Sequence, residues 1–180
     1  MLLTTDDIQT VHVAAAEVAI AQTPMLLQTV LGSCVAAVFW SERLQAGAMC
    51  HGALPDCPPS LLRNPGTPMS LRYVDHAIRY LTQRLCSLGT TPSELNVKLF
   101  GGADVLPISG SRAAISVGQK NCNTAIRTLE EEGLQLAASD LGGKRGRVIY
   151  FSTATGEVFL RRLQPTKIQD EDALPLLWVG

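Results

Sequence analysis

The sequence predicts an α+β sandwich with mixed or antiparallel sheets. Short apolar runs typical of strands outnumber helical segments, and several are separated by turns too short to hold a crossover helix. Apolar residues make up 46% of the 180 residues and charged residues 17%, which is typical of a compact globular protein. Because no internal repeat or linker divides the chain, we expect a single domain over residues 1–180.

The first third of the chain alternates apolar runs with turns. Residues 11–21 are apolar apart from Glu17 and predict one or two short strands. Residues 35–40 form an apolar run between Gly-Ser-Cys and Ser-Glu-Arg, which predicts a buried strand, and residues 46–52 predict its hairpin partner. Five prolines between positions 55 and 68 predict a loop.

Two helices are predicted. Apolar residues recur at spacings of three and four over residues 71–88 and form one stripe: Leu71, Val74, Ile78, Leu81, Leu85 and Leu88. We expect Ser70 to cap this helix and Gly89 to end it, and His76, off the stripe, to lie at the surface. The second helix spans residues 119–132. Its expected inner face consists of Cys122, Ala125, Ile126 and Leu129.

The remaining strands are predicted in the second half of the chain. Residues 95–100 predict a strand that ends at the Gly101-Gly102 pair. Three more strands are predicted over residues 134–138, 147–151 and 157–163. The basic cluster of Lys144, Arg145 and Arg147 lies among glycines and predicts a solvated turn.

Charge and composition exclude several classes of protein. The net charge is −1, and no basic stripe is interleaved with aromatic residues, so we expect no nucleic-acid partner. The most apolar stretch, residues 25–40, is too short to span a bilayer, and the N-terminus lacks the features of a secretory signal. Five cysteines, an odd number, then predict reduced thiols and a cytoplasmic protein without membrane insertion.

Cys34 and His51 are the candidates for chemistry. Cys34 stands at the start of a predicted strand, just after a glycine that permits a sharp turn, and His51 closes the predicted partner strand. If the strands pair, the imidazole reaches the thiol and can hold it as a thiolate. Taken alone, an inert buried cysteine is the commoner interpretation. Cys50, His51 and Cys57 lack a further pair to complete a zinc site, so no metal is expected.

Several short motifs, in order over residues 10–163, resemble those of the CheD family. They are Leu31-Gly32-Ser33-Cys34-Val35, His51 with Leu54-Pro55, Arg72-Tyr73-Val74-Asp75 with Ala77-Ile78, Lys98-Leu99-Phe100-Gly101-Gly102-Ala103, Gly118 with Asn121, and Asp140-Leu141-Gly142-Gly143 with Gly146-Arg147. The resemblance leaves residues 164–180 as a C-terminal tail. It implies a layered α/β/β/α-type sandwich similar to the catalytic domains of bacterial deamidating toxins.

The resemblance also implies an activity and its residues. CheD proteins convert glutamines on the cytoplasmic helices of chemoreceptors, the methyl-accepting chemotaxis proteins, to glutamate through a cysteine thioester, without a cofactor. Cys34 is then the nucleophile and His51 the general base. The threonine that orients the histidine is expected at Gln28; Thr29 is the nearest hydroxyl, and an ordinary strand threonine is an equal alternative.

Backbone N–H groups are the expected partners of the oxyanion that forms during such a reaction. They would come from the nucleophile turn, at Gly32, Ser33 and Cys34, or from the glycine pair Gly101 and Gly102.

Two other functions stay open on the sequence. The CheD family is known to bind and stimulate the chemotaxis phosphatase CheC, so the chain could be an adaptor for CheC or serve both roles. The mismatch at Gln28 favours the adaptor, whereas the presence of both Cys34 and His51 favours the enzyme. A general cysteine hydrolase or transglutaminase differs in the acceptor of the acyl group, which only the product reveals.

Overall fold

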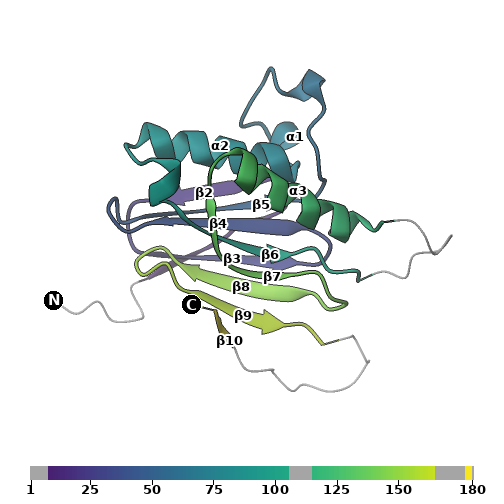
Figure 1. Cartoon of the computed structure of the whole chain (residues 1–180). Coiled ribbons are helices and arrows are strands. Elements are labelled where there is room, and N and C mark those ends of the chain that lie inside the picture. Colours follow the sequence, from purple (N-terminus) through teal and green to yellow (C-terminus); the bar gives the residue numbers. More distant parts are fainter. Residues whose placement is uncertain (1–7, 106–114, 165–176, 180) are drawn as a thin grey trace.

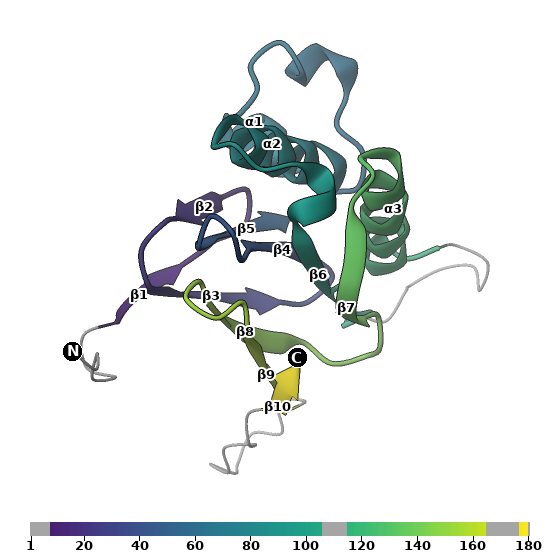
Figure 2. The same ribbon diagram turned by 60° about the vertical axis from the view of Figure 1, so that its left-hand side comes forward.

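Two five-stranded sheets pack face to face, and the helices of the described residues lie on one side of the pair (Figure 1). The structure is a computed structural model that describes residues 8–105, 115–164 and 177–179. In the turned view of Figure 2 the three layers are seen in order: helices, a sheet beneath them, and a second sheet below. The described residues therefore form an α/β/β sandwich.

The sheet under the helices is here called the covered sheet, and the other the open sheet. The covered sheet has the order β2 (Val18–Ala21), β5 (Ala46–Gly52), β4 (Val35–Ser41), β6 (Asn96–Gly101) and β7 (Gln135–Leu141). The open sheet has the order β1 (Gln9–His12), β3 (Met25–Leu31), β8 (Arg147–Ser152), β9 (Val158–Arg162) and β10 (Leu177–Val179). The pairs β1–β3 and β6–β7 are parallel and the others antiparallel, which confirms the prediction of mixed sheets.

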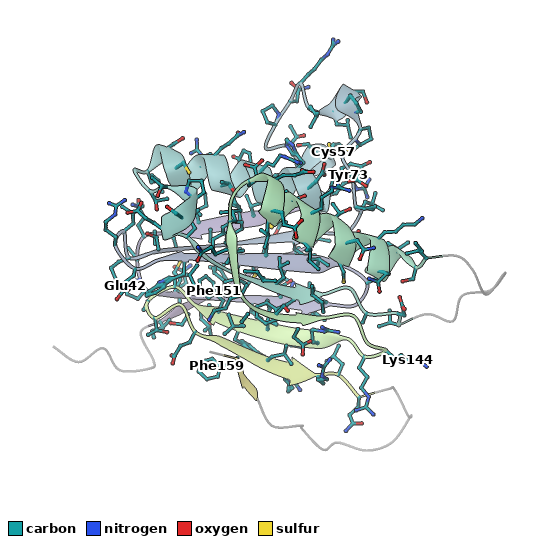
Figure 3. All side chains as sticks on the ribbon, in the orientation of Figure 1. Glu42, Cys57, Tyr73, Lys144, Phe151 and Phe159 are labelled. Carbon is teal, nitrogen blue, oxygen red and sulfur yellow. The ribbon has the colours of Figure 1, made fainter. Side chains whose placement is uncertain are left out.

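The helices are α1 (Pro68–Leu71), α2 (Val74–Ser87) and α3 (Val117–Glu131), with the 3-10 turns η2 (Pro59–Leu61) and η3 (Pro92–Glu94). One apolar core, which includes Ile78, Leu81 and Leu129, lies between these helices and the covered sheet. A second core lies between the sheets. In Figure 3, Phe151 is seen in this inter-sheet core, whereas Phe159 lies on the outer side of the open sheet. Each fully buried side chain of this size contributes about 1.5–3 kcal/mol to folding.

The layer count differs from the prediction of four layers. Helix α2 contacts β4 and β5, and α3 contacts β4, β6 and β7, so both cover the same sheet. Among the described residues, no helix covers the outer face of the open sheet (Figures 1 and 2). That face carries half-buried side chains such as Tyr150 and Phe159. No helix in the described ranges is long and apolar enough to cross a membrane.

The first predicted helix is interrupted, and Ser70 does not cap it. Thr67 caps the short α1 and accepts a hydrogen bond from the Ser70 N–H, while α2 starts after Tyr73. The interruption has a cause in the backbone. The Arg72 carbonyl accepts the N–H groups of residues 53 and 54, and the Val74 N–H donates to the Leu54 carbonyl at 2.7 Å, so Tyr73, between them, is extended. Gly89 follows α2 with a φ of 100°, as expected.

Four side chains lie where the sequence did not place them, and one of them is Leu88 of the predicted apolar stripe, which is 40% exposed. His76 is 8% exposed, because α2 contacts α3 as well as the sheet and buries more than its apolar stripe. Ile126, expected inside, is 39% exposed. Arg147, expected in a solvated turn, is fully buried because Asp140 and the Gly142 carbonyl pair with its guanidinium. Lys144 does extend outward (Figure 3).

The C-terminal tail contributes a strand. Leu177–Val179 forms β10, which pairs antiparallel with β9 at the edge of the open sheet. The rest of the tail, residues 165–176 and Gly180, lies outside the described residues.

Candidate active site

The candidate site lies at the edge of the covered sheet where β4 begins and β5 and β6 end. Cys34 immediately precedes β4, and His51 is the penultimate residue of β5. The antiparallel register pairs His51 with Ala36, so Cys34 is its diagonal neighbour. Diagonal neighbours on one face have Cβ atoms roughly 7 Å apart or less, a separation that longer side chains span. The predicted hairpin is therefore present, and its register puts Cys34 and His51 at diagonal positions of neighbouring segments.

Cys34 and His51 also share one face of the sheet. Side chains alternate along a strand, so Cys34 lies on the same side as Ala36, and His51 on the same side as Met49. Ala36 and Met49 belong to the inter-sheet core, and Cys34 packs against that core. The thiol and the imidazole thus both face the open sheet.

The open sheet supplies the hydroxyl group. Thr29, on β3, is fully buried, and its Oγ1 lies 2.8 Å from His51 Nδ1. Along β3, Leu27, Thr29 and Leu31 point inward, whereas Gln28 lies on the other face. The strand's alternation therefore selects Thr29 rather than Gln28 as the neighbour of His51.

A backbone carbonyl fixes the tautomer of His51. The Thr29 hydroxyl donates to the Val13 carbonyl at 2.6 Å, and His51 Nδ1 lies 3.3 Å from the same oxygen. A carbonyl oxygen only accepts, so Nδ1 carries the proton and donates to both oxygens. Nε2 is then the basic nitrogen. It is buried and has no hydrogen-bond partner among the described residues.

Burial favours the neutral forms of both groups. It lowers the pKa of His51, against the opposing effect of the Val13 carbonyl, and it raises the pKa of the Cys34 thiol. The sequence predicted a thiolate held by an imidazolium. The lowered pKa of His51 and the raised pKa of Cys34 favour instead a neutral thiol and a neutral imidazole at rest.

Cys50, the thiol nearest to His51 in the sequence, lies on the other face of the sheet. It is buried in the core under the helices, where burial raises its pKa to about 12. Such a thiol is inert at neutral pH. This leaves Cys34 as the cysteine on the same face as His51.

The carbonyl groups of the three successive residues 32–34, the turn that carries Cys34, are held by three different neighbours. Gly32 O accepts from the Ala103 N–H at 2.8 Å, and Cys34 O accepts from the Gly102 N–H at 2.7 Å. Between them, Ser33 O accepts from the side-chain amide of Asn121 at 2.9 Å. In the described part of the chain, the N–H groups of Ser33 and Cys34 donate to no oxygen.

The glycine pair at the end of β6 supports this turn. Gly101 and Gly102 have φ angles of 113° and 69°, which favour glycine. A Cβ on Gly101 would lie 2.1 Å from the Cys34 carbonyl oxygen, and one on Gly102 would lie 2.0 Å from the Cys122 sulfur. The Gly102 N–H is used by Cys34 O, so this group does not serve as an oxyanion donor as the structure stands.

Comparison with known proteins gives the family. The model of the family described as "CheD chemotactic sensory transduction" matches residues 54–162, more than half of the chain. The chain belongs to the CheD family. That match begins after Cys34 and His51, but the matches to individual CheD proteins are longer.

Curated CheD relatives match most of the chain. It is 41% identical over 157 residues to the "Probable chemoreceptor glutamine deamidase CheD 2" of Geobacter sulfurreducens, which covers 87% of this chain and 92% of the relative. It is 37% identical to a protein named "Probable chemoreceptor glutamine deamidase CheD" from Maridesulfovibrio salexigens, over 88% and 94% of the two chains. A protein of the same name from Rhodospirillum rubrum is 40% identical over 78% and 75%. A match of 157 residues within 180 includes both Cys34 and His51.

Two further groups of this CheD site were not found from the sequence. The Val13 carbonyl is a backbone group and leaves no signal in the residue type. Asn121 belongs to one of the motifs that resemble those of the family, but nothing in the sequence indicates that its amide reaches the turn at residues 32–34. Both depend on the packing of distant segments.

A separate polar hollow of about 280 Å³ lies at the other end of the covered sheet, near Trp40, Asn96 and Gln135. No thiol or imidazole lines it. Among the described residues, no group of three or more His, Cys, Asp or Glu side chains is placed to hold a metal ion.

Proposed function

We propose that this chain is a protein-glutamine deamidase that converts glutamine side chains on the cytoplasmic helices of chemoreceptors to glutamate and releases ammonia. The names of the curated relatives support the substrate. One observation carries the chemistry: Thr29 and Val13 hold the Nδ1 proton of His51, and Nε2 is left as a base on the face that it shares with Cys34. We place this activity in the cytoplasm, where these receptor helices lie.

The first half of the proposed reaction forms a thioester. The Cys34 sulfur attacks the side-chain carbonyl carbon of the glutamine, and His51 Nε2 takes the thiol proton. The carbonyl oxygen becomes an oxyanion, and the proposed donors are the N–H groups of Ser33 and Cys34, which donate to no oxygen of the described residues. His51 returns the proton to the amide nitrogen, the C–N bond breaks, and ammonia leaves.

The second half regenerates the thiol. Neutral His51 takes a proton from water, the resulting hydroxide attacks the thioester carbon, and the tetrahedral intermediate forms again. The C–S bond then breaks and the sulfur receives the proton from His51. The net change is one water consumed, one ammonia released and one glutamine converted to glutamate. The protein groups involved are a thiol, an imidazole and backbone N–H groups, without a metal or an organic cofactor.

Mass spectrometry of the product tests this function. Receptor cytoplasmic fragments incubated with the protein should gain about one mass unit at defined glutamines, since an amide becomes an acid. In a transglutaminase reaction, an added amine would instead be found attached to the glutamine. No mass change on receptors from the same organism would contradict the proposed function.

Replacing Thr29 tests its role in orienting His51. We expect Thr29→Val to lower kcat by roughly 10- to 100-fold, because His51 Nδ1 loses the hydroxyl and the ring can take other orientations. Thr29→Ser keeps the hydroxyl and should retain most of the activity. Equal losses in both variants, measured by ammonia release, would show that the hydroxyl has no role in the reaction.

The pH profile of kcat/KM should be a broad bell. The pKa of His51 is lowered from 6.5, so the base stays neutral at pH 6.5 and activity falls only as the pH drops through the lower value. The pKa of Cys34 is raised from 9.0, so the alkaline limb lies above pH 9.0. An acid limb above pH 6.5 would contradict the burial of an uncharged His51.

The lowered pKa of His51 also makes the stability of the fold depend on pH. Below pH 6.5 the unfolded chain protonates His51 while the folded chain does not, so stability falls with pH down to the folded-state pKa. Circular dichroism at each pH separates this loss of fold from a loss of activity.

Binding of CheC stays a prediction. The feature that favoured a purely non-catalytic adaptor was the glutamine at position 28, where the family was expected to have threonine. Because Thr29 points to His51 and Gln28 does not, that feature no longer favours the adaptor.

A further inference from the structure

Asn121 makes contacts that helix packing alone does not explain. It lies on α3, near the start of the helix, and is fully buried. Its Nδ2 lies 2.9 Å from the Ser33 carbonyl oxygen and 3.1 Å from the Ala53 carbonyl oxygen. Ser33 immediately precedes the nucleophile, and Ala53 follows the strand that carries His51. One buried amide thus joins the two segments that present the thiol and the imidazole.

The orientation of this amide follows from its partners. Both neighbouring atoms are carbonyl oxygens, which only accept, so the NH₂ group and not Oδ1 must face them. Both hydrogens of the amide are then used, one on each carbonyl. Oδ1 is buried and has no partner among the described residues, which is an unfavourable state for a polar atom. The two hydrogen bonds from Nδ2, here called the Asn121 bridge, therefore form although Oδ1 is left without a partner among the described residues.

The bridge determines the direction of a candidate oxyanion donor. In a trans peptide the C=O and N–H bonds point in opposite directions. Since Asn121 holds the Ser33 C=O toward α3, the Cys34 N–H must point away from the helix. The thiol lies on that side, because it packs against the inter-sheet core, on the face of the covered sheet that looks away from α3. The N–H thus points to the side on which the sulfur would attack a substrate carbonyl, whose oxygen would become the oxyanion.

We propose that Asn121 is a positioning residue, which fixes the Ser33–Cys34 peptide so that the Cys34 N–H can stabilise the oxyanion and which couples this peptide to the end of β5. This inference rests on the proposed deamidase function. It assigns Asn121 no contact with the substrate. Its effect should therefore appear in steps that develop an oxyanion and not in every reaction of the thiol.

Two reactions of Cys34 separate this role from a general effect on the fold. Deamidation develops an oxyanion, whereas alkylation by iodoacetamide is a displacement at carbon that does not. We expect Asn121→Leu, of similar size, to lower kcat by roughly 10- to 100-fold with KM little changed. Alkylation of Cys34 should stay within about twofold of the unmutated rate. Asn121→Ser keeps one donor hydroxyl and should recover part of kcat.

Thr128→Val is the matched control. Thr128 is also fully buried on α3, and its hydroxyl donates to the Thr124 carbonyl at 2.8 Å, away from the nucleophile turn. We expect Thr128→Val to leave both deamidation and the alkylation of Cys34 unchanged. If kcat of Asn121→Leu matched that of Thr128→Val, the positioning role would be wrong. A parallel fall of deamidation and alkylation in Asn121→Leu would also overturn it, because that pattern indicates a loosened site.

A measurement independent of activity tests the same idea. The backbone order parameter of the Cys34 amide, from ¹⁵N relaxation, should be near that of rigid backbone, about 0.85, in the unmutated chain and in Thr128→Val. In Asn121→Leu it should fall. An unchanged value would contradict the positioning role. The unmutated chain could fail to deamidate while the order parameter of the Cys34 amide still falls in Asn121→Leu. That result would contradict the proposed function alone.

Discussion

Cys34→Ala is expected to lower kcat for deamidation by roughly 10⁴-fold or more while leaving the fold intact, because no other group in the proposed mechanism can form the acyl intermediate. The fold should survive, since Cys34 is only partly buried and lies between strands rather than in one. Ammonia release and circular dichroism measure the two effects separately.

Cys86→Ala is the matched control for this substitution. Cys86 is also a partly buried thiol whose pKa is raised chiefly by burial, but it lies near the C-terminal end of α2. It should keep full activity. If Cys34→Ala also kept full activity, the assignment of the nucleophile would be wrong; if both variants lost activity together, the loss would reflect the fold.

His51→Ala is expected to lower kcat by roughly 10²- to 10⁴-fold, because the reaction loses its base and its proton donor. Alkylation of Cys34 by iodoacetamide at neutral pH should also slow. Burial raises the pKa of the thiol, and the variant lacks the base that the proposed mechanism uses to accept its proton. The alkylation rate reports on the pairing without any receptor substrate.

His76→Ala separates the role of His51 from the effect of removing a buried imidazole. Both histidines are buried, both have a pKa lowered by burial, and both have an Nε2 without a partner among the described residues. His76 lies on α2, outside the inter-sheet face. The His76 variant should be destabilised but active. Unchanged alkylation kinetics in His51→Ala would contradict the pairing of His51 with Cys34.

The sequence predicted the central pair because the hairpin is local. Strands 35–40 and 46–52 are separated by a short turn, and pairing them places Cys34 and His51 at the same edge. The choice between Gln28 and Thr29 depended on which face of β3 meets the inter-sheet core. That face is set by packing against β8 and the covered sheet, and motif spacing could not determine it.

Features that depend on contacts between distant segments could not be predicted. The chain passes from β1 in one sheet to β2 in the other, and this crossover brings the Val13 carbonyl to Thr29 and His51. The break before α2 arises from backbone pairing with residues 53–55. The local sequence pattern placed His76 and Arg147 at the surface. His76 is buried because α3 packs against α2, and Arg147 because it pairs with Asp140.

The most direct test of the central claim is to trap the intermediate on Cys34. A receptor peptide that contains a target glutamine is mixed with the protein, quenched in acid, and analysed by intact-protein mass spectrometry and digestion. We predict an adduct on the Cys34 peptide equal to the substrate mass minus that of ammonia, absent from Cys34→Ala. Formation of glutamate without any adduct, at the same rate in Cys34→Ala, would contradict covalent catalysis by this cysteine.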